Sequence, residues 1–148
     1  MEQRDGVQKL PFQLIGRREY VYFPDWDVGP IRAKIDTGAR SPAIDVASIE
    51  LLPSKKVRFG VIADNKKRET VRHLECRISR RSTVRSSNGK SEERFFVKTR
   101  MRLGGHIRMV EIGLVCRKNM LCRALIGRTC LEGVFWVDVS GKYLLGKE

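Results

Sequence analysis

One aspartate stands in a sequence context that suits acid–base chemistry. Asp36 begins an Asp-Thr-Gly tripeptide directly after residues 31–35, in which apolar residues alternate with Arg and Lys. This alternation predicts a half-buried strand, and Gly38 allows a sharp turn that presents the Asp36 carboxylate at the strand end. The tripeptide alone is weak evidence, because it also suits a turn in which the aspartate caps its own backbone.

Peptide-bond hydrolysis without a metal or a covalent nucleophile needs one base and one acid. Two carboxylates that are held close together share a proton and so divide these two roles. The chain contains a single Asp-Thr-Gly, since no Thr-Gly follows its other aspartates, Asp5, Asp25, Asp27, Asp45, Asp64 and Asp138. The second carboxylate would therefore come from a second copy, whose Asp36 meets the first at a two-fold axis.

The middle of the chain predicts a β-hairpin. Residues 95–103 alternate between an apolar face and a more polar face, and a weaker alternation covers residues 78–84. Asn88-Gly89 lies between the two runs and predicts a two-residue turn, because both residues tolerate positive φ. Such a turn would place Arg85 opposite Glu92 across the ladder, as a pair of opposite charge.

The other elements that the sequence predicts are short. Gly104-Gly105 predicts a second hairpin turn between residues 95–103 and 107–115. We expect one helical segment over Ala47–Leu52, one or two helical turns over Thr129–Gly133, and strands over Ala124–Ile126, Val134–Val139 and Tyr143–Leu145. Because helix signals are so few, the sequence predicts a single all-β domain of barrel or sandwich type.

In combination, these segments resemble the retropepsin-like aspartic peptidases. The closer resemblance is to a bacterial family whose members have been labelled "ATP-dependent zinc proteases". It rests on Ile15–Tyr20 (IGRREY), Ala33–Ala43 (AKIDTGARSPA), Val84–Gly89 (VRSSNG), Leu125–Leu131 (LIGRTCL) and Phe135–Gly146 (FWVDVSGKYLLG). The resemblance implies an acid-protease barrel with one lobe per chain and one short helix, formed by residues 15–148 after an N-terminal extension of residues 1–14.

The resemblance also implies roles for individual residues. Asp36 would be catalytic, Thr37 would hold the dyad across a dimer interface, and Gly38 would complete the motif. The hairpin at residues 86–90 would be a flap that closes over the substrate, although a merely solvated hairpin is the alternative. The expected substrate-binding residues are Ala39, Arg40, Arg85, Ser86, Ser87, Asn88 and Gly89, and the expected structural support of the site is Ile126, Gly127 and Arg128. In retropepsins the chain ends interleave at the dimer interface, and Tyr143–Gly146 would be the segment that does so here.

Arg40 departs from the pattern of the retroviral relatives, which carry an acidic residue directly after the alanine. That acid usually pairs with the arginine of the Gly-Arg motif, so Arg128 would instead cap nearby carbonyls or pair with Glu132. A cation at Arg40 would lower the pKa values of the nearby aspartate dyad. Arg40 could also bind an acidic side chain of the substrate. The alternative is that Arg40 neutralises a structural carboxylate.

The positive charge of the chain indicates an anionic partner but does not identify which kind. The chain carries a net charge of +13, and residues 72–102 contribute ten basic residues against three glutamates. Such a field attracts polyanions, whether nucleic acid, an anionic membrane or an acidic protein segment. We therefore expect a homodimeric endopeptidase acting on acidic, and in particular glutamate-rich, protein segments, since its relatives are associated with ligases that append glutamates. The alternatives are a non-catalytic basic module for RNA or a ribosomal partner, and a pure dimerisation domain.

No cofactor is expected from the motifs. The chain has four cysteines without a Cys-x-x-Cys pair, two histidines, no His-Glu-x-x-His and no phosphate-binding glycine loop. We expect free, mostly buried thiols and a cytoplasmic location, because the first nine residues lack the apolar core of a signal peptide. The apolar runs are too short to cross a membrane.

Overall fold

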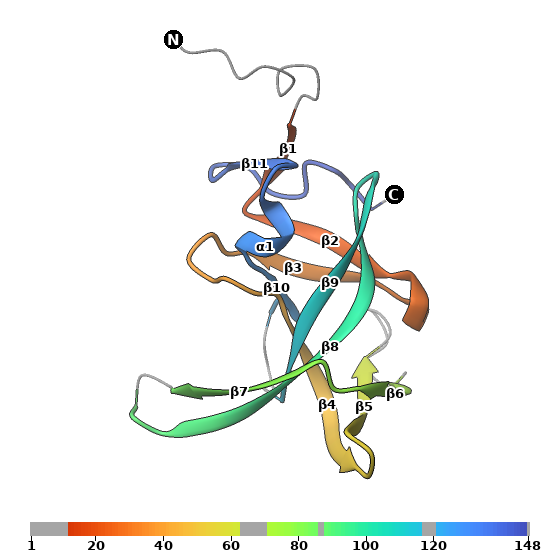
Figure 1. Ribbon diagram of the computed structural model, residues 1–148. Coiled ribbons are helices and arrows are strands. Elements are labelled where there is room, and N and C mark those ends of the chain that lie inside the picture. The colour runs from red at the N-terminus through yellow and green to blue at the C-terminus, as the bar shows by residue number, and fades with distance from the viewer. Residues whose placement is uncertain (1–11, 63–70, 86–87, 117–120, 148) are drawn as a thin grey trace.

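The computed structural model describes residues 12–62, 71–85, 88–116 and 121–147 and shows an all-β fold with one short α-helix (Figure 1). Within these ranges the strands are β1 (Gln13–Gly16), β2 (Arg18–Phe23), β3 (Val28–Ile35), β4 (Ala43–Leu52), β5 (Lys56–Ile62), β6 (Val71–Arg77), β7 (Arg80–Arg85), β8 (Ser91–Leu103), β9 (His106–Val115), β10 (Ala124–Ile126) and β11 (Phe135–Asp138). The helices are the 3-10 turn η1 (Pro24–Trp26) and α1 (Arg128–Leu131). Neither helix is long and apolar enough to span a membrane.

Six strands close into a barrel because β10 pairs along both of its edges. It runs parallel to β3, with Ile126 beside Ile35, and antiparallel to β4, with Leu125 beside Ala43. The barrel order is therefore β10-β3-β2-β8-β9-β4 and back to β10. The far half of β4 continues into β5 and β6, while β7 and the first half of β8 form a two-stranded arm that projects from the barrel (Figure 1).

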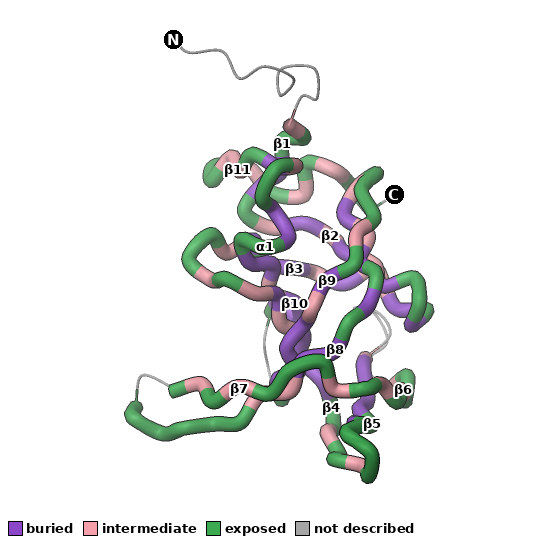
Figure 2. The backbone as a smooth tube through the Cα atoms, in the orientation of Figure 1, coloured by how far each residue is buried: buried purple, intermediate pink, exposed green. Residues whose placement is uncertain are grey.

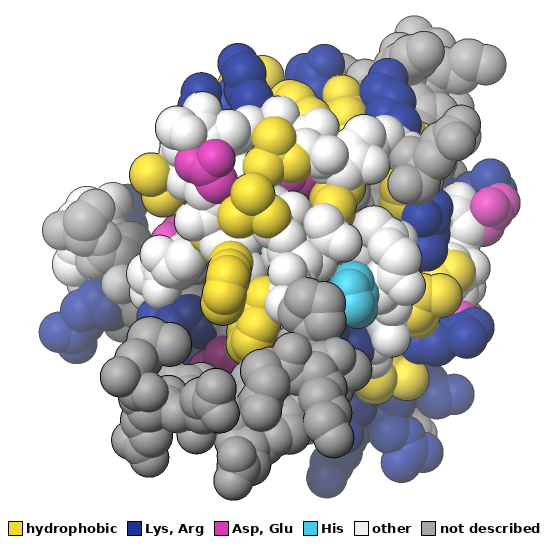
Figure 3. All heavy atoms as spheres, turned by 90° about the horizontal axis from the view of Figure 1, so that it is seen from above, with side chains coloured by type: hydrophobic (Ala, Val, Ile, Leu, Met, Phe, Trp, Pro, Cys, Tyr) yellow, Lys and Arg dark blue, Asp and Glu magenta, His cyan; other side chains and the backbone are white. Residues whose placement is uncertain are grey.

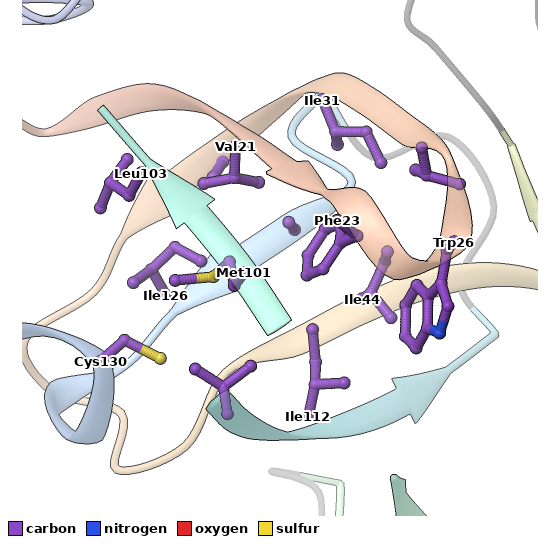
Figure 4. Packing of buried hydrophobic residues seen from close by; sticks show 14 of the residues in the cluster. Val21, Phe23, Trp26, Ile31, Ile44, Met101, Leu103, Ile112, Ile126 and Cys130 are labelled. Atoms are coloured by element: carbon purple, nitrogen blue, oxygen red, sulfur yellow. The ribbon is translucent and has the colours of Figure 1, made fainter. Parts of the chain in front are cut away.

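The core fills the inside of this barrel, as the predicted alternation requires. In β3, Ile31 and Ala33 are fully buried and Lys34 is exposed, and in β8 the side chains of Val97, Thr99, Met101 and Leu103 are buried (Figures 2 and 4). One detail differs: Phe95 is only half-buried, whereas Phe96 on the other face is buried. The reason is that the Arg80 guanidinium lies 3.8 Å from the Phe96 ring centroid and covers it.

The two predicted hairpins form, but one has a different register. Leu103 pairs with His106, so Gly104-Gly105 is the predicted two-residue turn. In the arm, Arg85 pairs with Ser91 and not with Glu92, so the expected register about Asn88-Gly89 is shifted by one residue. The Asn88 side chain accepts the Lys90 backbone N–H at 3.1 Å, which makes a local turn of a different kind from the expected tight one.

Two further expectations are wrong. Residues 47–52 are not helical: they belong to β4 and pair with β5 through Leu52 and Lys56, so tertiary strand pairing overrides local propensity. Residues 143–145 do not form a strand, because their backbone N–H groups are taken by Arg18 and Glu19. The predicted helical turn after Gly127 and the strand after Gly133 are confirmed as α1 and β11 to within one or two residues.

Glu19 is a fully buried carboxylate in β2 that ties the end of the chain to the barrel. Its Oε2 accepts the backbone N–H groups of Gly16 at 2.8 Å and Leu144 at 2.9 Å, and its Oε1 accepts that of Leu145 at 3.1 Å. A buried charge is tolerated where hydrogen bonds replace its lost hydration. The fold of residues 141–147 therefore depends on this side chain.

Glu19→Ala should lower the free energy of unfolding by about 3 kcal/mol, because the buried N–H of Gly16 and the partly buried N–H groups of Leu144 and Leu145 lose their acceptor. Urea titration followed by circular dichroism measures this loss. Glu50→Ala is the matched control, since Glu50 makes only an exposed ion pair with Arg58, and it should cost less than about 1 kcal/mol. Equal losses in the two variants would contradict the structural role of Glu19.

Candidate active site

Asp36 lies at the mouth of the barrel because β3 ends directly before it. Its backbone N–H donates to the Ile126 carbonyl at 2.9 Å, which extends the β3–β10 pairing by one residue. The half-buried Asp36 carboxylate accepts the Gly38 N–H through Oδ1 at 2.9 Å. Asp36 therefore caps its own turn, as the first interpretation of Asp-Thr-Gly requires, and the turn in return fixes the position of the carboxylate.

Gly127 and the start of α1 pack backbone to backbone against the Asp36 loop. The N–H of Arg128 donates to the Ala39 carbonyl at 2.8 Å, and that of Thr129 to the Arg40 carbonyl at 2.9 Å. A Cβ on Gly127 would lie 2.8 Å from the carbonyl carbon and oxygen of Arg40. Only glycine therefore permits this approach, which holds the Asp36 loop in place.

The Arg128 side chain bonds a carbonyl, the first of the two partners expected for it. Its Nη1 donates to the Thr37 carbonyl at 3.0 Å. This contact fixes the backbone next to Asp36 and leaves the Thr37 side chain exposed. The hydrogen bond replaces the pairing with an acid that Arg40 excludes.

A cavity of about 270 Å³ lies between the Asp36 loop and the base of the arm. Its lining residues are Arg40, Ser41, Thr129, Arg80, Met109, Val110 and Glu111. Arg80 Nε donates to Glu111 Oε1 at 2.9 Å, and this hydrogen bond holds the pKa of Glu111 below its usual range. Since Glu111 is paired, the exposed Arg40 is the cation that this cavity offers to a ligand.

A second pocket, of about 390 Å³, borders the strand end that carries Asp36. Its lining includes Ile35, which directly precedes Asp36, and the cations Arg17, Arg18 and Lys34. Arg18 and Lys34 face each other across the β2–β3 ladder, an arrangement that is unfavourable without an anion nearby. Sequence reasoning missed these residues. Their alternation with buried neighbours places them on the outer face, but only the strand register brings them together.

The predicted site residues fall into two groups. Asp36–Arg40 and Ile126–Arg128 come together as described above. Arg85, Asn88 and Gly89 lie at the exposed end of the arm, whereas its base contributes Arg80 to the cavity (Figure 1). Ser86 and Ser87 lie outside the described residues. No three His, Cys, Asp or Glu side chains in the described part of the chain come together as metal ligands.

The four cysteines are free thiols, as expected, but only two of them are fully buried. Cys122 and Cys130 are buried, Cys76 is half-buried and Cys116 is exposed. Burial raises the pKa of Cys130 to about 11, so this thiol is protonated at neutral pH. It acts as a core residue and not as a nucleophile.

The comparison with family models identifies the chain. Residues 14–148 match the family described as "Retropepsin-like aspartic endopeptidase RimB". The chain belongs to this RimB-like family. Among solved structures, a protein of unknown function from Legionella pneumophila is similar, with a TM-score of 0.71, 24% identity and coverage of 89% of this chain and 97% of that one. At that identity the likeness shows the fold, which is the expected retropepsin-like barrel.

Curated relatives carry a different name. The chain is 32% identical over 140 residues to a "probable alpha-L-glutamate ligase" from Shewanella halifaxensis, and 27% identical over 143 residues to another from Desulfotalea psychrophila. The matches cover 91% and 95% of this chain but only 30% and 31% of those proteins. The chain thus spans less than a third of the length of these relatives.

Gly127→Ala should destabilise the fold by about 2 kcal/mol and disturb the Asp36 loop, because its Cβ meets rigid backbone. Gly105→Ala is the matched control, since a Cβ there meets nothing within 4 Å. Urea unfolding of both variants measures the difference. A Gly127→Ala protein as stable as Gly105→Ala would show that the start of α1 and the Asp36 loop are not held together as described.

Proposed function

We propose that residues 15–148 form the subunit of a homodimeric aspartic endopeptidase whose dyad is Asp36 of each copy. The observation that carries this proposal is the fixed carboxylate at the mouth of the barrel, oriented by the Gly38 N–H and backed by the Ile126 carbonyl. Membership of the RimB-like family supports the reaction class. The single Asp-Thr-Gly supports the need for a second copy.

The dyad would act by moving protons between water, peptide and carboxyls. The ionised Asp36 takes a proton from a water as its oxygen attacks the peptide carbonyl carbon, and the protonated Asp36 of the other copy donates to the carbonyl oxygen. The first Asp36 then gives the proton that it took from water to the amide nitrogen, the second Asp36 takes back a proton from a hydroxyl of the tetrahedral intermediate, and the C–N bond breaks to leave an amine and a carboxylic acid. The two apparent pKa values would belong to the pair, since one proton is shared.

Acidic segments are the substrate class that the surroundings of Asp36 favour. One cavity beside the Asp36 loop offers Arg40, and the other offers Arg17, Arg18 and Lys34. A carboxylate side chain in either place would form charge-assisted hydrogen bonds, and an anion would relieve the repulsion between Arg18 and Lys34. The name of the curated relatives also supports this substrate class. A glutamate ligase would make glutamate-rich segments, and a peptidase that accepts such segments would cleave them.

The arm formed by β7 and β8 would close over the bound segment. Its base already borders the Arg40 cavity, and its connection to the barrel is braced by Arg80 against Phe96 and Glu111. The exposed end with Arg85, Asn88 and Gly89 would then reach the substrate only in the closed state and exclude water from the dyad.

Asp36→Asn should reduce cleavage of glutamate-rich peptides by roughly 1,000-fold, because the dyad loses its shared proton and its base. Mass spectrometry of peptides incubated from acidic to mildly basic pH measures this, with a chelator present to remove metal catalysis. Circular dichroism checks that the variant is folded. Cleavage that persists in Asp36→Asn would overturn the assignment. A folded wild type that cleaves nothing and instead binds RNA in a salt-sensitive way would favour the basic binding module.

Arg40→Gln should lower kcat/KM for a glutamate-rich peptide by about tenfold, because one charged hydrogen bond is lost. The kcat/KM for a matched peptide with glutamine in place of glutamate should stay nearly unchanged. Lys34→Gln tests the other pocket in the same way. The exposed Lys56, at the start of β5, supplies the control variant Lys56→Gln, which removes the same charge away from both pockets. A uniform loss in all three variants would indicate general electrostatic attraction and not a specific contact.

A further inference from the structure

All three tyrosines of the chain lie on the outside of the barrel at strand β2, although Tyr143 is far from the other two in the sequence. Burial alternates strictly along β2, so Tyr20 and Tyr22 both face away from the core. The ring of Tyr143 stacks on that of Tyr20, with centroids 4.6 Å apart and an angle of 26° between the planes. We call this surface, together with the basic side chains around it, the tyrosine face.

Hydrogen bonds between distant segments hold Tyr143 in this position. Its N–H donates to the Arg18 carbonyl at 2.7 Å. The N–H groups of Leu144 and Leu145 donate to the buried carboxylate of Glu19. The stack of two rings is therefore part of the fold and is in place before a ligand binds.

Basic side chains surround these rings. Arg102 pairs with Tyr22 across β2 and β8, and its guanidinium carbon lies 4.0 Å from the centroid of that ring. Arg32 on β3 is the register partner of Tyr20, and the Lys147 ammonium lies 5.2 Å from the Tyr20 ring centroid. A polyanion that follows β2 would therefore meet a cation beside each ring of this strand.

The charge of the molecule is carried by the sides of the barrel on which this face lies. Seen from above in Figure 3, Lys and Arg side chains lie mainly around the rim of the molecule, while hydrophobic ones lie nearer the centre of the view. On the tyrosine face, burial raises the pKa of Tyr143, and the nearby Arg32 and Arg18 oppose this shift. The hydroxyl is therefore protonated at neutral pH and can donate a hydrogen bond.

Rings that alternate with cations suit one class of polyanion better than the others. The three tyrosines are only half-buried, so part of each ring is left for a ligand. One base can add to the Tyr20–Tyr143 stack and another to the guanidinium plane of Arg102, which lies over Tyr22. A single strand can do this because its bases are not paired, and Tyr20 and Tyr22 are spaced by about 7 Å along the strand. A glutamate-rich segment would use the cations but has no π-face to place on the rings.

We propose that the tyrosine face binds single-stranded nucleic acid, as an activity separate from peptide cleavage. Two or three bases stack on the tyrosines and on Arg102, while Arg32 and Lys147 bind phosphates. The sequence suggested RNA only as the ligand of a non-catalytic module. The tyrosine face does not use Asp36, so one chain can carry both activities.

Fluorescence anisotropy of labelled uridine and thymidine oligonucleotides, each about 12 nucleotides long, tests the face with the full-length chain. Tyr20→Leu should raise the Kd about tenfold, because the support of one stacked base is lost. Phe95→Leu is the matched control and should change nothing, since Phe95 also lies beside an arginine, 5.1 Å from Arg81, but in the arm. Equal losses in the two variants would overturn the proposal. A tighter Kd for the ribose or for the deoxyribose oligonucleotide identifies which nucleic acid is the ligand.

The salt dependence of binding tests the cations separately from the rings. Lys147→Gln should lower the slope of log Kd against log salt concentration by about 0.7, because one phosphate contact is lost. Lys56→Gln removes the same charge from an exposed lysine at the start of β5 and should leave the slope unchanged. The same change in both variants would indicate diffuse attraction by the net charge of +13 and would contradict a defined site.

Ultraviolet cross-linking followed by mass spectrometry locates the oligonucleotide on the wild-type chain. Adducts should form on the tyrosines of this face. Adducts confined to the arm would overturn the proposal even if the wild type binds the oligonucleotide tightly. Circular dichroism checks that each variant is folded.

A glutamate-rich peptide of the same charge separates this inference from the proposed function. Tyr20→Leu should leave binding and cleavage of the peptide unchanged, because Tyr20 lines neither pocket beside the Asp36 segment. Equal loss of affinity for peptide and oligonucleotide would make this face a site for acidic segments and overturn the inference, and Asp36-dependent cleavage would still support the peptidase. Oligonucleotide binding at the tyrosine face by a wild type that cleaves nothing would overturn the peptidase and support the face. A folded wild type that binds neither oligonucleotide overturns the inference alone.

Discussion

The arrangement of the whole molecule depends on one short strand, β10, which is hydrogen-bonded on both edges. Its three residues lie between β3 and β4, and this double pairing is what closes the barrel. The residue directly after this strand is Gly127, whose missing side chain lets the start of α1 approach the Arg40 backbone. The strand that closes the barrel therefore also positions Asp36, because the carbonyl of its last residue, Ile126, accepts the Asp36 N–H.

Two carboxylates of this chain show how surroundings decide what an acid does. Glu19 is fully buried and accepts three backbone N–H groups, so its oxygens are used up in holding the C-terminal segment. Asp36 is half-buried and accepts one N–H, from Gly38, at a single oxygen. A carboxylate can accept about four hydrogen bonds, so this one bond leaves acceptor capacity at Asp36 unused.

Basic side chains line the two pockets beside the segment that carries Asp36. Arg18 and Lys34 are opposite neighbours on adjacent strands, and Arg40 is exposed in a position where acid would have paired with Arg128. An anionic ligand bound there would relieve the repulsion between Arg18 and Lys34. The arm contrasts with this region, since its arginines at positions 80 and 81 are paired with Glu111 and Glu93.

Local sequence patterns predicted the all-β class, the strand that carries Asp36 and the Gly104-Gly105 hairpin. They also drew attention to the Asp-Thr-Gly and Gly-Arg motifs. These features depend on period-two alternation and on glycine, which act over a few residues. What the sequence left open needed contacts between distant segments: the pairing of 47–52 with β5, the capture of 143–145 by Glu19, and the meeting of Arg18 with Lys34. Tertiary structure decided them because strand partners and registers are set by which faces the whole barrel can bury, which no local pattern contains.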